Sequence, residues 1–179
     1  MSRYIKNSFK DTASALAFGM TFGYLINTFI MKNCLAEGSS MYPTIKDKDR
    51  GFSLVIQKDN DSLKRFDIVV IENNHKLIIK RIIGLPGETV EYKDDCLFIN
   101  GQKIREYFLD ETYVNEEKQR MQRVQFTNDL SVTLKEDEYF CLGDNRLHSS
   151  DSRVYGPFKR ESIRSKGFKR YYPPFRKEI

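Results

Sequence analysis

The chain has 179 residues, 40% of them hydrophobic and 13% aromatic, which suffices for one ordinary core but not for two large domains. Its formal net charge is +5 at pH 7. No helix-turn-helix, zinc-finger or RNA-binding motif accompanies the basic residues, so we expect no nucleic-acid partner. The cysteines, Cys34, Cys96 and Cys141, are too widely spaced for a disulfide framework or a metal-ligand set, and we expect neither a metal nor a cofactor.

An uncharged run of twenty residues at positions 12–31 follows a short basic segment at residues 1–11. At about 1.5 Å per residue the run spans roughly the 30 Å core of a bilayer, which predicts a single transmembrane anchor. The basic flank predicts a cytoplasmic tail at 1–11 and an extracytoplasmic domain at 32–179. A buried helix of a soluble protein is the alternative. A cleaved signal peptide is disfavoured because no small-x-small site follows the run.

Beyond residue 31 the pattern is period-two and rich in β-branched and aromatic residues, which is typical of strands. Asn100-Gly101 predicts a type I′ hairpin turn, and residues 106–123 form a polar excursion. The fold class is therefore mostly β, an antiparallel domain of packed sheets or a partly closed barrel. The predicted strands lie within residues 51–57, 65–72, 76–83, 89–92, 96–101, 124–127, 131–134 and 138–144.

The stretch "EGSSMYPT" at residues 37–44 carries two adjacent serines, Ser39 and Ser40, either of which is a candidate nucleophile or a turn residue. A serine hydroxyl needs a base, because it is a weak nucleophile at its free pKa. His148 lies in "RLHSSDS", where all the ingredients of a triad share one short loop. Side chains of sequence neighbours seldom converge, so a histidine-based triad is disfavoured.

A lysine serves as the base when burial lowers its pKa toward neutrality, which requires an apolar setting. Lys80 has one, because "KLIIKRII" surrounds it with isoleucines, and the period of a strand places Ile78, Lys80 and Ile82 on one face. The alternative is an edge-strand lysine that extends its amine into water.

The stretch "LGDNRLHSSDSRVYGPF" at residues 142–158 is dense in hydroxyls, carboxylates and arginines directly after an apolar strand. Asp144, Asp151 and Arg153 can form a network of ion pairs that keeps a loop rigid, and a serine there can orient a lysine amine. Taken alone, the stretch is equally typical of a polar turn.

These three stretches, in this order behind an N-terminal anchor, resemble the type I signal peptidases, which are membrane-anchored Ser/Lys proteases. "GSSMYPT" is similar to the family's G-x-S-M-x-P-T box, "KRIIGLPGE" to its lysine box and "GDNRLHSSDSR" to its last box. The resemblance covers nearly the whole chain and is greatest to the compact Gram-positive form. It implies a serine endopeptidase of the cell membrane that processes signal peptides during protein secretion.

Carried over position by position, the resemblance implies that Ser40 is the nucleophile, Lys80 the general base and Ser149 the serine that orients the lysine. It implies acyl-enzyme formation, with the backbone N–H of Ser40 in the oxyanion hole. The second donor stays open, because Gly38 stands where some relatives carry a serine. The implied structural residues are Asp144, Arg146, Asp151, Ser152, Arg153 and Arg81, with Arg81 as a partner of Asp151.

The fold and the resemblance together imply that an extended Ala-x-Ala segment adds as a strand to a sheet edge. Met41, Ile78 and Ile79 are the candidates for lining its two shallow pockets. The implied partners are secretory preproteins, with pilins as one class of them, and the lipid bilayer. We expect the protein to act as a monomer.

The sequence departs from the family pattern in two places. The stretch "DKDR" at residues 47–50 replaces the usual Asp-Gly turn, and Phe66 replaces the usual glycine before Asp67. These departures keep a second hypothesis open: an assembly factor for pili or surface proteins that acts by binding, with weak or specialised cleavage. The related self-cleaving repressors are disfavoured, because they carry a DNA-binding domain where this chain has its apolar run.

Overall fold

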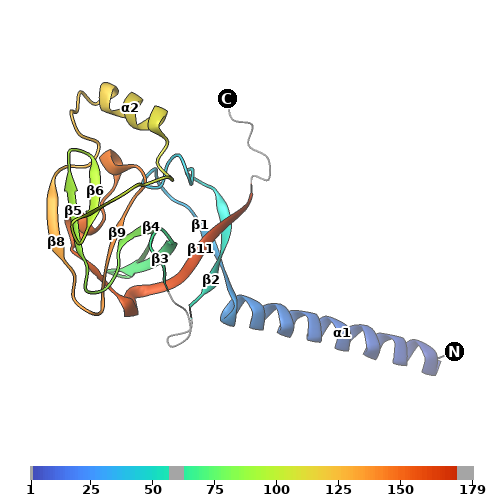
Figure 1. The fold of residues 1–179 in the computed structure, drawn as a ribbon. Coiled ribbons are helices and arrows are strands. Elements are labelled where there is room, and N and C mark those ends of the chain that lie inside the picture. Colours follow the sequence, from blue (N-terminus) through green and yellow to red (C-terminus); the bar gives the residue numbers. More distant parts are fainter. Residues whose placement is uncertain (1, 57–62, 173–179) are drawn as a thin grey trace.

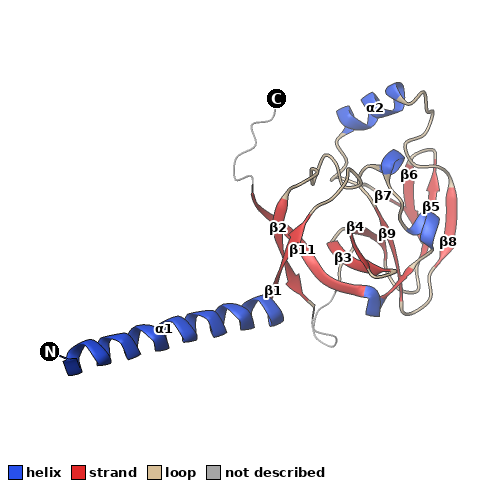
Figure 2. Ribbon diagram, turned by 180° about the vertical axis from the view of Figure 1, so that it is seen from behind, coloured by secondary structure: helices blue, strands red, loops and turns tan. Residues whose placement is uncertain are grey.

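The computed structural model describes residues 2–56 and 63–172, which form a long N-terminal helix followed by two antiparallel β-sheets (Figure 1). The helix α1, Ser2–Phe29, projects away from the sheets, whereas both sheets and the short helix α2, Glu111–Arg120, gather in one β-rich domain. Figure 2 shows the same arrangement from behind, with the strands in red.

The larger sheet has seven strands in the order β1-β2-β11-β3-β4-β9-β10, and every neighbouring pair is antiparallel. Its central strands β3 and β4 carry runs of valine and isoleucine, and β4 also carries the buried Lys80 and Arg81. The strands are β1 Met31–Leu35, β2 Arg50–Val55, β3 Ile68–Asn73, β4 Lys76–Gly84, β9 Glu138–Leu142, β10 Phe158–Lys159 and β11 Ile163–Tyr172.

The smaller sheet has four strands in the order β7-β6-β5-β8. Its strands are β5 Thr89–Lys93, β6 Cys96–Ile99, β7 Gln102–Ile104 and β8 Leu130–Thr133. The predicted hairpin is confirmed: Ile99 pairs with Gln102, and Asn100 and Gly101 have φ values of 50° and 77°. Positive φ at both central residues is what a type I′ turn requires.

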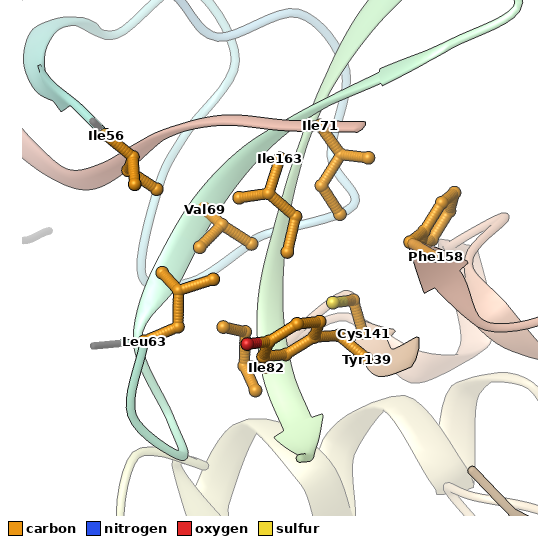
Figure 3. Packing of buried hydrophobic residues seen from close by; sticks show 9 residues of the cluster. All are labelled: Ile56, Leu63, Val69, Ile71, Ile82, Tyr139, Cys141, Phe158 and Ile163. Atoms are coloured by element: carbon orange, nitrogen blue, oxygen red, sulfur yellow. The ribbon is translucent and has the colours of Figure 1, made fainter. Parts of the chain in front are cut away.

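The main core of the larger sheet combines residues of β3, β4 and β9 with residues that follow β2, precede β3 and lie in β10 and β11 (Figure 3). Val69, Ile71, Ile82 and Cys141 have no exposed surface, and each isoleucine buried in this way contributes roughly 1.5–3 kcal/mol. The full cluster comprises Ile56, Leu63, Val69, Ile71, Ile82, Tyr139, Cys141, Phe158 and Ile163.

Helix α1 ends at Phe29 and β1 begins at Met31, so the last residue of the predicted anchor lies in a strand. The helix also includes the basic segment, because it begins at Ser2. By its hydropathy, no helix in the described part of the chain combines the length and the apolarity of a membrane span. The anchor predicted at 12–31 and the sidedness predicted from it are therefore not confirmed.

Other features of the elements also differ from the predictions. The described chain forms two antiparallel sheets and no closed barrel, so the mostly β domain of sheets is confirmed and the partly closed barrel is not. Residues 124–127 form no strand, and the polar excursion contains α2, which Asp110 begins by accepting a hydrogen bond from Tyr113 N–H over 3.1 Å. Strand β11 was not predicted, because its buried positions hold Ser165 instead of a second apolar residue after Ile163.

Candidate active site

Ser40 lies in a turn between β1 and β2, and buried neighbours hold that turn in place. Met41 and Ile45 are each 3% exposed and pack with Ala36, and Ile45 N–H donates to the Met41 carbonyl over 2.8 Å. The apolar residues of "MYPTI" thus fix the backbone while Ser40 stays partly exposed. Ser39 is exposed.

Lys80 lies in β4, an interior strand of the sheet, and pairs with Val69 of β3. Its side chain is 3% exposed, so the alternative of an edge-strand lysine in water is wrong. The Lys80 Nζ donates a hydrogen bond of 2.8 Å to Ser40 Oγ. The fold therefore brings together two predicted site residues that are 40 positions apart.

Burial lowers the pKa of the Lys80 amine from 10.5 to about 8. Asp151 opposes this shift by its negative charge, Arg153 reinforces it, and Asp144 again opposes it. The lysine is thus close enough to neutrality for an appreciable fraction to be unprotonated at pH 7–8, as a general base requires.

The carboxylate of Asp151 is fully buried and is held by Arg153, whose Nε and Nη2 each donate over 2.8 Å. Gly143 N–H donates to the same carboxylate over 3.0 Å. Burial alone would raise the pKa of Asp151, but these donors and the charge of Arg153 bring it below its usual value. Ser152 Oγ accepts from Cys141 N–H over 2.9 Å and so joins this segment to β9.

The predicted pairing of Arg81 with Asp151 is wrong. Arg81 instead donates from Nε and Nη2 to Asp144, over 2.8 and 2.6 Å, and Thr44 Oγ1 donates to the same carboxylate over 2.5 Å. Arg81 follows Lys80 and points to the opposite face of β4. Asp144 therefore connects β4 to the segment that follows the nucleophile candidate.

Arg146 is buried and connects the last box to the smaller sheet. It donates from Nη1 to Tyr92 Oη and to Thr127 Oγ1, each over 2.9 Å, and its Nη2 pairs with Glu106. Arg146 thus has the structural role predicted for it, because it joins the segment after β9 to residues of the smaller sheet and its neighbouring loops.

The Ser149 hydroxyl is buried but makes no hydrogen bond to Lys80 among the described residues. It lies beside Gly143, where an added Cβ would clash with both Ser149 Oγ and the Ser40 carbonyl. Ser149 thus lies close to Ser40, beside Gly143. The role of Ser149 in orienting the lysine stays a prediction.

The three predicted pocket residues, Met41, Ile78 and Ile79, line the same groove as Ser40 and Lys80. The groove has a volume of about 110 Å³ and is bounded by the end of β1 and by β4. A groove of this size between two strands suits small side chains of an extended peptide.

Both departures from the family pattern lie at residues with positive φ, Lys48 at 65° and Phe66 at 72°. Left-handed backbone is the conformation in which glycine avoids the cost that a Cβ brings. Phe66 offsets this cost by packing, with its ring centroid 5.0 Å from that of Phe108, and its carbonyl accepts from Arg81 Nη1 over 2.9 Å.

Asn145 is a site residue that the sequence analysis did not single out. Its N–H donates to the Ser40 carbonyl over 3.0 Å, and its Nδ2 donates to the Ser39 carbonyl over 3.1 Å. Its position between Asp144 and Arg146 was the available signal. Among the described residues the Ser40 N–H donates to no acceptor, so it is open to a developing oxyanion.

Comparisons with known proteins agree with this arrangement. The family model described as "Signal peptidase, peptidase S26" matches residues 9–172. A signal peptidase I of Bacillus licheniformis is 40% identical over 151 residues, 83% of this chain and 80% of the relative. Signal peptidase I T of Bacillus subtilis is 40% identical over 150 residues, 82% of this chain and 76% of the relative.

A crystal structure of a signal peptidase I from Enterococcus faecalis is similar in fold. It has a TM-score of 0.51 and 37% sequence identity, and the match covers 60% of this chain and 97% of that one. The family match and the curated relatives each extend over most of the sequence. The chain therefore belongs to the signal peptidase family, peptidase S26, and is a serine peptidase of the signal peptidase I kind.

Proposed function

We propose that this peptidase removes N-terminal signal peptides after an Ala-x-Ala-like site, with Ser40 as the nucleophile and Lys80 as the general base. The single observation that carries the proposal is the 2.8 Å hydrogen bond between Lys80 Nζ and Ser40 Oγ. The burial that lowers the pKa of Lys80 to about 8 supplies the neutral amine that the reaction needs.

In the proposed reaction, neutral Lys80 takes the hydroxyl proton of Ser40 as Oγ attacks the scissile carbonyl. The Ser40 N–H stabilises the resulting oxyanion, and the loss of such a donor typically slows catalysis by about 10² to 10³. The tetrahedral intermediate collapses to an acyl-enzyme when protonated Lys80 returns the proton to the leaving amine. Water, deprotonated by the same lysine, then releases the signal peptide.

Three residues of the last box support this dyad in the proposal. Asn145 fixes the backbone carbonyls of Ser39 and Ser40. Ser149 is the neighbouring hydroxyl that hydrogen-bonds to the lysine once substrate orders the site. Arg153 pairs with Asp151 and lowers the pKa of Lys80 by its own charge, which partly offsets the stabilisation of protonated Lys80 by Asp151.

We also propose that α1 holds the domain at a membrane, where the preproteins that it cleaves emerge. The apolar side chains of its described part are exposed, among them Leu16 at 62%, Phe18 at 72% and Met20 at 70%. Surface of this kind is stabilised when it leaves water. Sharing a membrane with its substrates would also raise their local concentration.

The test is cleavage of a purified preprotein by the full chain in detergent, beside Ser40→Ala and Lys80→Ala. We expect the wild type to cleave and each variant to lose at least 10³-fold in rate, because the nucleophile and its base act as one unit. Equal cleavage by either variant would refute the dyad. A folded wild type without any cleavage would favour the assembly factor that acts by binding.

A further inference from the structure

A second groove, of about 390 Å³, lies beside Ser40 and is not used in the proposed reaction; we call it the α2 groove. Ser39 and Tyr42, which flank Ser40 and Met41 in the same turn, form one wall of it. The other walls come from α2 and from the turn at Asn145–His148. Its lining residues are Ser39, Tyr42, Tyr113, Glu116, Glu117, Arg120, Asn145 and His148.

This groove and the groove beside Lys80 share no lining residue and are built by different elements. The groove beside Lys80 is bounded by β1 and β4, and the second groove by α2 and the last box. The inner residues of one turn, Ser40 and Met41, contribute to the first groove, and the residues that flank them, Ser39 and Tyr42, contribute to the second. A polypeptide whose scissile bond lies at Ser40 therefore leaves one groove and enters the other.

We infer that the α2 groove binds the segment that follows the scissile bond, and that Glu116 makes it prefer basic residues there. The inference deepens the proposed function and rests on it, because Ser40 must be where the substrate is cut. The first groove holds the residues before the bond, and the leaving chain begins in the second.

The charges in the α2 groove set this preference. Glu117 is 9% exposed, and its carboxylate is bound by Arg120 Nε and Nη2 over 3.0 and 2.6 Å and lies 3.2 Å from His148 Nε2. Arg120 therefore compensates the charge of Glu117. Glu116 is exposed and makes no ion pair among the described residues, so its carboxylate is the uncompensated charge of the groove.

Side-chain contacts hold the walls of the groove in position relative to Ser40. The rings of Tyr42 and Tyr113 meet edge to face with centroids 5.0 Å apart, which packs α2 against the turn of the nucleophile. The Glu117–His148 contact joins the same helix to the last box. Glu116 thus projects from a helix whose distance from Ser40 is fixed at two points.

The experiment compares two fluorogenic peptides that are identical through an Ala-x-Ala site and carry Lys-Lys or Glu-Glu at the second and third positions after the cut. The wild-type full chain in detergent should cleave the Lys-Lys peptide with about a fivefold higher kcat/KM, since an exposed charge contributes up to about a factor of five. Glu116→Gln should abolish the difference, and Glu116→Lys should reverse it.

Glu111→Lys is the matched control, because it makes the same charge change on the same helix but lies outside the α2 groove, beside Arg105. This variant should keep the wild-type preference. An unchanged preference in Glu116→Lys, or the same change in Glu111→Lys, overturns the inference while cleavage itself stands. Failure of the wild type to cleave either peptide counts against the proposed function instead.

Discussion

At the scale of single residues, the most consequential feature is a lysine whose charged form the fold destabilises by burial. Lys80 is almost fully buried, and its pKa falls from 10.5 to about 8. The same burial therefore lowers the free energy of unfolding and supplies the neutral amine that acts as the base. These two effects can be measured separately.

The rate of cleavage should follow the neutral fraction of Lys80. Below the folded pKa of about 8 the amine is protonated, so kcat/KM should fall about tenfold for each further pH unit and level off above pH 9. A profile of kcat/KM between pH 6 and pH 10 measures this dependence. A flat profile across this range would contradict a lysine base.

Arg153 provides a finer test of the same group, because its positive charge helps to lower the pKa of Lys80. Arg153→Met also leaves Asp151 free to stabilise the protonated amine. The midpoint of the profile should therefore shift to higher pH. Arg164→Met, which removes an exposed ion pair with Glu72, should leave the midpoint in place.

Lys80→Met should make the protein inactive but more stable at pH 7. A folded-state pKa about 2.5 units below that of the unfolded chain costs roughly 3 kcal/mol at pH 7, and methionine avoids this cost. The cost disappears as pH rises from about 8 to 10.5, because the lysine is then neutral in both states. Urea unfolding at pH 7 and pH 10 checks this, and a gain that does not shrink with pH would refute the explanation.

At the scale of elements, buried ion pairs hold the last box against both sheets. Arg81 and Asp144 connect it to β4 and to the nucleophile turn, whereas Arg146 and Glu106 connect it to the smaller sheet. The site residues come from separate elements, so their spacing depends on these connections.

Arg146→Met should lower the free energy of unfolding by about 3–5 kcal/mol, because it leaves the buried Glu106 carboxylate without its partner. Adding Glu106→Gln should restore at least half of the loss, since the uncompensated charge is then gone. Arg164→Met serves as the exposed control and should cost less than about 1 kcal/mol. Chemical denaturation of the four proteins, wild type included, checks this. Equal losses in the single and double variants would contradict the argument.

At the scale of the whole molecule, a β-rich domain follows a helix whose described apolar side chains are exposed to solvent. The rings of Phe18 and Phe22 stack with centroids 6.0 Å apart on one side of α1. Such surface favours contact with lipid, as we propose for its function.

Replacing both rings, Phe18→Ser with Phe22→Ser, should weaken binding of the full chain to phosphatidylglycerol vesicles by at least about 100-fold. Each phenylalanine that leaves water contributes roughly 1.5–3 kcal/mol. Co-sedimentation measures the binding. Tyr107→Ser is the control, because Tyr107 is 72% exposed but belongs to the β-rich domain. Unchanged binding by the double variant would show that α1 is not the attachment.

The sequence by itself determined the local features of this protein. Period-two runs predicted most strands, and Asn100-Gly101 predicted the hairpin, because both depend on neighbours along the chain. The resemblance of the three boxes implied Ser40 as the nucleophile and Lys80 as its base. Strand β11 escaped prediction, because a serine at a buried position is stabilised by another hydroxyl, Ser53 Oγ at 2.8 Å, which lies over 100 residues away.

Only the tertiary structure decided which distant groups meet. It paired Arg81 with Asp144 instead of Asp151, placed Asn145 under the nucleophile turn, and opened the α2 groove beside it. It also made Lys80 a buried residue of an interior strand, which periodicity could not distinguish from an exposed edge. The physical reason is that burial and charge pairing depend on contacts between elements. The sequence pattern of a single element shows which side chains it carries but not which distant side chains they contact.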